Sequence, residues 1–72
     1  MQVGDLFKDK TGTLVEVSGF WDKRDIDWEC PESVAIIGMV KVIVLTGENA
    51  GRTRQFRRSN FRRQFTSLKE AM

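Results

Sequence analysis

Alternating apolar and polar positions near the start of the chain predict a β-hairpin. Residues 3–9 read as a short extended piece, a turn follows at Lys10, Thr11 and Gly12, and residues 13–17 (TLVEV) carry the β-branched alternation of a half-buried strand. Gly19 continues that pattern, and a glycine inside a strand commonly marks a β-bulge or sharp bend. Trp21 comes next, and we expect its large ring to cap a small core.

The middle of the chain divides into a polar and an apolar stretch. Residues 22–32 are rich in carboxylates and contain Pro31, which has no amide hydrogen for a β-ladder, so we interpret them as a long acidic connection. Residues 34–45 carry apolar side chains on both faces, as a central strand does. Gly38 is the predicted bulge or break between two shorter strands.

The last third predicts a second hairpin followed by a short helix. The turn signal at residues 47–51 (GENAG) returns the chain into a strand over residues 52–57. Ser59 is a candidate N-cap, and Phe61, Phe65 and Leu68 recur at i, i+4 and i+7, so all three should point inward.

These elements predict a mainly β domain that comprises the whole chain, residues 1–72. Four or five strands with glycine bends and a helical turn near the C-terminus describe a small SH3-like, partly open barrel, with an OB-like barrel as the alternative. A chain of this length buries only roughly 60% of the surface exposed on unfolding, so its stability margin is small.

Positive charge is concentrated in the segment GRTRQFRRSNFRRQF, residues 51–65. It holds six of the twelve basic residues in a chain of net charge +2: Arg52, Arg54, Arg57, Arg58, Arg62 and Arg63. Guanidinium groups bind phosphate and carboxylate bidentately and stack on flat rings, so this cluster is the best candidate for a partner-binding surface. We expect Phe56, Phe61 and Phe65 to be core residues, with Arg58 and Arg62 sharing an outer helix face beside Arg63.

The partner of this surface is either protein or nucleic acid. Trp28 lies among carboxylates and should be exposed, a setting that DNA would disfavour and a protein partner would suit. Asp25, Asp27 and Glu29 alternate, so an extended chain would place their carboxylates on one face. We expect these carboxylates to pair with the arginines or to form a separate acidic surface for another partner, rather than to bind Mg²⁺.

Several function classes lack the residues that they need. The chain has no histidine and no tyrosine, and its single Cys30 can form neither an intramolecular disulfide nor, alone, a zinc site. A Cys-His or Ser-His nucleophile cannot be assembled, and residues 47–51 lack the lysine of a P-loop. We therefore expect no enzyme activity, cofactor or metal. With neither a signal peptide nor a transmembrane stretch in the sequence, we expect a cytoplasmic protein of a bacterial host cell.

The two ends of the chain resemble short proteins of unknown function encoded by phages and prophages. The resemblance rests on VGDLFKDKTGTLVEVSGF at the start and RQFRRSNFRRQF at the end, and it does not extend over residues 22–32. It implies a phage or mobile-element origin. Because those proteins have no assigned activity, it assigns no functional residue.

The sequence thus predicts a non-catalytic binding protein that engages a host or phage protein through the six arginines and Trp28. A protein of this size could inhibit a defence machine, as anti-CRISPR proteins do, or a transcription machine. Nucleic-acid binding with little sequence preference is the alternative. Edge strands and the apolar residues 34–45 also suggest a homodimer.

Overall fold

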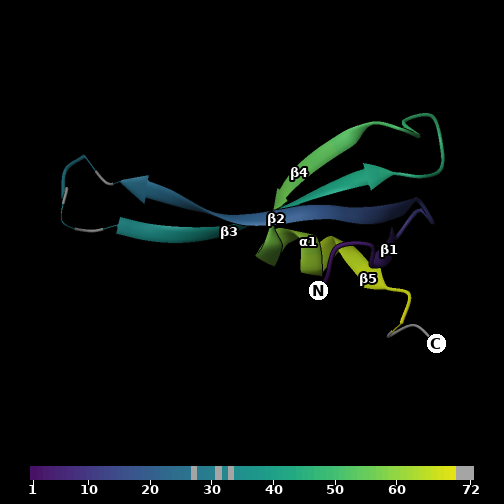
Figure 1. The fold of residues 1–72 in the computed structure, drawn as a ribbon, viewed down its shortest axis with the longest axis horizontal. Coiled ribbons are helices and arrows are strands. Elements are labelled where there is room, and N and C mark those ends of the chain that lie inside the picture. The colour runs from purple at the N-terminus through teal and green to yellow at the C-terminus, as the bar shows by residue number, and fades with distance from the viewer. Residues whose placement is uncertain (27, 31, 33, 70–72) are drawn as a thin grey trace.

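The computed structural model describes residues 1–26, 28–30, 32 and 34–69. Its five strands form an open antiparallel sheet in the order β4-β3-β2-β1-β5, and one short helix lies between the last two strands of the chain (Figure 1). The prediction of a mainly β, partly open small fold with a short C-terminal helical segment is therefore confirmed. The narrower choice between an SH3-like and an OB-like barrel stays a prediction.

The first hairpin forms as predicted, between β1 (Leu6–Asp9) and β2 (Leu14–Ile26). Asp9 organises its turn: the carboxylate accepts hydrogen bonds from the Thr11 hydroxyl at 2.6 Å and from the N–H groups of Thr11 and Thr13 at 2.9 Å. Gly12 has a φ of 88°, a conformation that favours glycine. The Thr11 hydroxyl and these N–H groups hold the pKa of Asp9 below its ordinary value, because they stabilise the carboxylate.

A long hairpin forms where the sequence analysis expected an acidic connection. β2 runs on to Ile26 and pairs with β3 (Val34–Val44), so residues 22–26 are strand, and the predicted acidic connection is wrong over that range. Asp27 and Pro31, which also belonged to that prediction, lie outside the described residues. Gly38 pairs with Asp22 in an unbroken ladder, so the predicted break in β3 is wrong too. The register shift lies in β2, between Val17 and Gly19, which confirms the bulge predicted at Gly19.

The end of the chain returns to the other edge of the sheet. β4 (Thr53–Arg57) pairs with β3, α1 (Arg58–Gln64) follows at once, and β5 (Phe65–Ser67) pairs with β1. The helix begins one residue before Ser59, with Arg57 at the N-cap and no capping side chain, so the predicted cap is wrong. Phe65 belongs to β5 rather than to the helix, because its extended backbone ends α1.

The core lies between one face of the sheet and α1. It consists of five valines and three phenylalanines, with Phe56 packed against them half-buried: Phe7, Val15, Val17, Val40, Val42, Val44, Phe61 and Phe65. Phe61 is fully buried, with its ring centroid 4.6 Å from that of Phe65 and 4.9 Å from that of Phe7. The expected inward positions of Phe61 and Phe65 are confirmed. Burial of these side chains is the main source of the fold's stability.

The outer half of the β2 and β3 hairpin projects from this core. Residues 22–26 and 34–38, called the arm below, pair only with each other within the described chain, because β4 ends opposite Met39 and β1 begins opposite Glu16. Figure 1 shows the arm extending away from the other strands and both termini, and the molecule measures 43 Å along its longest axis.

Candidate partner-binding surface

The structure distributes the six arginines over several surfaces. Residues opposite each other in an antiparallel ladder share a face of the sheet. Arg54 is opposite the buried Val42, so it lies on the core face, with its guanidinium carbon 4.8 Å from the centre of the Phe56 ring. Arg57 is opposite Met39, one residue out of phase with Val40, and therefore lies on the opposite face, called the outer face below. Arg52 is exposed just before β4.

Arg58 occupies an internal position at the root of the arm. It forms an ion pair with Asp22, and its guanidinium lies 5.9 Å from the centre of the Phe20 ring. A Cβ atom added to Gly38 would come within 2.7 Å of the Arg58 guanidinium carbon, so only glycine leaves room for this side chain there. The expectation that Arg58 projects outward beside Arg62 is therefore wrong; its side chain joins α1 to the arm and is only 34% exposed.

Arg62 and Arg63 are exposed on α1 but border different hollows. Arg62 lies beside Phe65 and the first strand, whereas Arg63 lies beside the turn of the first hairpin, near Asp9 and Lys10. Both are in the last turn of the helix, where a positive charge is stabilised by the helix dipole. Each thus has a local structural role beside any role in binding.

Trp28 lies at the far end of the arm from these arginines. It is 86% exposed, as predicted, and it comes after the last paired residues of the arm, Ile26 and Val34. That pair is four residues from the pair formed by Asp22 and Gly38, or roughly 13 Å along a strand. The seven predicted partner-binding residues therefore do not form one continuous patch.

The outer face instead contains a compact row that the sequence analysis did not identify. Trp21 is opposite Met39, and Met39 is opposite Arg57, so the three side chains lie next to one another across β2, β3 and β4. Trp21 is 39% exposed, and Arg57 is also exposed. The helix packs through Phe61 on the core face, away from this row. We call these three residues the outer row.

The position of Trp21 corrects the expectation that it caps the core. Strict alternation from Val15 and Val17 would place it on the core face, but the bulge after Val17 adds one residue to β2 and reverses the alternation. Phe20 therefore lies opposite Val40 on the core face, and Trp21 turns outward. Counting residues on either side of the predicted bulge would have found this.

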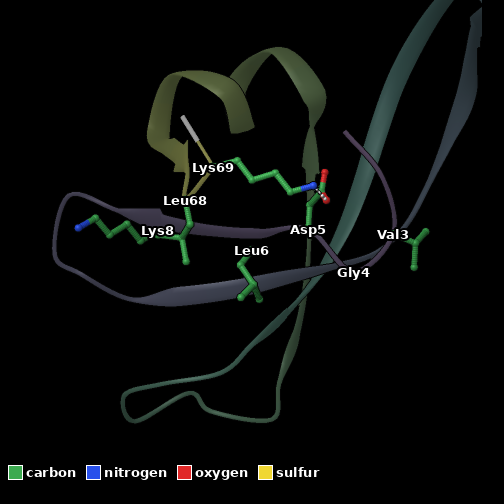
Figure 2. Close-up of a pocket in the computed structure, with 7 residues that line it drawn as sticks. All are labelled: Val3, Gly4, Asp5, Leu6, Lys8, Leu68 and Lys69. Carbon is green, nitrogen blue, oxygen red and sulfur yellow. Dashed lines mark hydrogen bonds and ion pairs between the residues drawn. The ribbon is translucent and has the colours of Figure 1, made fainter. Parts of the chain in front are cut away.

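A hollow near the N-terminus is lined by residues of the first strand and of the chain end after β5. Figure 2 shows Lys69 reaching across it to Asp5, with Leu6 and Leu68 between Lys8 and the Asp5 side chain. The Lys69 amino nitrogen is 3.4 Å from Asp5, and the Gln2 N–H donates to the same carboxylate at 2.8 Å. The Gln2 hydrogen bond, aided by Lys69, keeps the pKa of Asp5 below its ordinary value. The hollow's one carboxylate is therefore already bonded within the chain.

The described residues provide no ready site for a metal ion. In the ranges that the structure covers, no three carboxylate or thiol side chains gather closely enough to hold one. Asp25 lies on the outer face of β2, opposite Ala35, and Cys30 is exposed. Asp27 lies outside the described residues, so the predicted carboxylate stripe stays a prediction.

No described helix has the length and apolar composition needed to cross a membrane. Comparison of the chain with protein-family models, curated proteins and solved structures gives no match.

Proposed function

We propose that this chain is a non-catalytic binding protein that engages another protein through the outer row, Trp21, Met39 and Arg57. The observation that carries the proposal is the position of these side chains side by side on a face that the helix does not cover. Of the predicted partner-binding residues, the outer row contains only Arg57. Its other two members, Met39 and Trp21, are the residues that follow across the neighbouring strands β3 and β2.

The residue types of the outer row suit a protein partner. Tryptophan and arginine are the side chains most enriched among residues that dominate binding energy, and methionine is also enriched in interfaces. Trp21 and Met39 offer apolar area to be covered, while Arg57 has no carboxylate partner among the described residues. A partner surface that combines an apolar pocket with an Asp or Glu side chain would match this row.

Trp28 extends the surface that a partner could reach. Its ring is the most exposed large apolar side chain of those described, and its truncation should leave the core intact. A partner that binds the outer row and follows the arm would bury this ring as well. The origin in a phage or mobile element rests on the resemblance of the two chain ends, and a role as an inhibitor of a defence or transcription machine rests on that origin and on the size of the chain.

Nucleic acid is the second candidate, favoured by the exposed arginines Arg52, Arg57, Arg62 and Arg63. Binding of this kind would weaken steeply with salt, because each neutralised phosphate of duplex DNA contributes about −0.9 to the slope of log affinity against log salt. It would depend on all four arginines to a similar degree and little on Trp21.

A pull-down from bacterial lysate, with and without nuclease, tests the proposal. We expect a protein that is retained after nuclease treatment and is lost with Trp21→Ala or Arg57→Ala. The matched controls are Phe20→Ala, which removes a comparably exposed ring from the opposite face, and Arg52→Ala, which removes an exposed arginine outside the row. Loss of all captured material on nuclease treatment, or equal loss with the controls, would contradict the proposal.

A further inference from the structure

The two free edges of the arm differ in how they are protected against pairing with another strand. The β2 edge carries Asp22, Lys23, Arg24 and Asp25, and it follows a bulge. Charges and bulges are the usual means by which edge strands avoid pairing. If this edge paired antiparallel with the same edge of a second copy, the residue on the two-fold axis would face its own copy. With the axis at any of these four residues, two like charges would then lie opposite each other.

The β3 edge of the arm has none of these features. Residues 34–38 (VAIIG) contain no charge, no proline and no register shift. Val34 is 49% exposed and Ile36 is 69% exposed, although both lie on the face that is buried further along the strand. An apolar strand edge of this kind is suited to pair with another strand rather than to remain in water.

We propose that two copies of this chain join through this edge, with β3 antiparallel to β3 of the second copy and Ile36 opposite Ile36. The pairing would convert two arms, each a two-stranded ribbon, into one four-stranded sheet. Two-stranded ribbons are marginally stable alone, whereas three or more strands with an apolar face can be stable. The proposal is independent of the proposed partner surface, because it uses the strand edge and leaves the outer row open.

The register follows from the length of the free edge. Beyond Gly38 the edge is occupied by β4, which begins to pair at Met39, and at the other end β3 begins at Val34. Centring the pair on Ile36 places Val34 opposite Gly38 of the second copy, so the new strand stops next to Arg57, the last residue of β4. On either side of the central Ile36 pair a larger side chain then faces a smaller one, because Ile37 falls opposite Ala35 and Val34 opposite Gly38.

The backbone groups point in the required direction. The Val44 N–H donates to the Arg52 carbonyl and the Val44 carbonyl accepts from the Gly51 N–H, so Val44 directs its polar groups toward the β4 side. Alternation along a regular strand directs those of Ile36, Val34 and Gly38 toward the same side, which is open in the arm. Opposing Ile36 residues would thus exchange both hydrogen bonds.

Sedimentation analysis over a range of protein concentrations tests the inference. We expect a dimer that dissociates on dilution, and we expect Ile36→Lys to weaken it about tenfold or more, because two ammonium groups would face each other. Ile26→Lys is the matched control, since Ile26 is an exposed residue on the same face of the arm but belongs to β2. A monomer at every concentration, or equal weakening by both variants, would overturn the proposal.

Cysteine cross-linking defines the register and remains decisive if Ile36→Lys fails to fold. In a Cys30→Ser background, Ile36→Cys should form a disulfide-linked dimer under mild oxidation, because hydrogen-bonded opposite residues have Cα atoms about 5.5 Å apart, within disulfide range. Val34→Cys should not, since the two Val34 positions would be separated by four residues along the strands. Equal cross-linking of both variants would show that the contact is not the proposed one.

Discussion

Strands β2 and β3 run through both the arm and the rest of the sheet, which we call the body. Apolar side chains of these strands are buried in the body and exposed in the arm. In the body, Val17, Val40 and Val42 are fully buried because α1, β1 and β4 surround the ladder. In the arm, Val34, Ile36 and Ile26 lie on the same face but remain 46–69% exposed, because no other described element reaches them. The body is therefore the part that makes the protein fold, and the arm is the part available for association.

Two phenylalanines give the largest test of this comparison. Phe61→Ala should destabilise the protein by about 3–5 kcal/mol, because it empties the centre of the core. A domain of this size has a total stability of roughly 4–10 kcal/mol, so much of the population should unfold. Phe20→Ala, at the root of the arm, should cost less than about 2 kcal/mol. Urea denaturation measures both, and similar losses would mean that the arm is as well packed as the body.

The connection between the two regions gives an intermediate effect. Gly38→Ala should displace the Arg58 side chain and break its ion pair with Asp22, at a cost of about 1 kcal/mol or less, since the Asp22 side chain is 64% exposed and water screens the pair. In a double-mutant cycle, Gly38→Ala should have little further effect once Arg58 is alanine. Full additivity in thermal or urea denaturation would show that the two residues act independently.

The smallest effect concerns pH and lies in the body. Because hydrogen bonding lowers the pKa of Asp9 in the folded state, its stabilising contribution is present above the unfolded value of 3.8 and is lost as the pH falls through the lower folded value. The melting temperature should therefore fall on acidification in this range, and by less in Asp9→Ala. Ile26→Ala, in the arm, should keep the acid dependence of the unmodified protein. An identical acid profile for Asp9→Ala would contradict this assignment.

The body was also the part that the sequence predicted well. Glycines at the turns, β-branched alternation and the spacing of Phe61 and Phe65 all arise from local conformational preference and burial, which act over a few residues. The β2 half of the arm was not predicted, although the strand containing residues 34–38 was, because a ladder exposed to water accepts charged residues such as Lys23 and Asp25 as readily as a loop does. Composition therefore does not distinguish an exposed two-stranded ladder from a loop.

The arginines show a second limit of sequence reasoning. Their density along the chain indicated a single surface, but β4 alternates, placing Arg54 and Arg57 on opposite faces of the sheet. The pairing of Arg58 with Asp22, a residue 36 positions earlier, depends on the register of β2 and β3. The first arrangement follows from the alternation of a strand, whereas the second does not follow from the local sequence, because it is set by which strand lies next to which.

The bulge of β2 decides which side chains the distal half of that strand displays on each face of the sheet. Everything in that strand beyond Ser18 is rotated by half a turn relative to the alternation that precedes it. A regular ladder that kept Ser18 but lost the bulge would exchange the two sets of side chains in the distal strand, turning the indole of Trp21 inward and the benzyl group of Phe20 outward. Removing Ser18 together with the bulge would leave both rings on their present faces, so it is the way the strand accommodates its extra residue that decides which ring meets the solvent on each side.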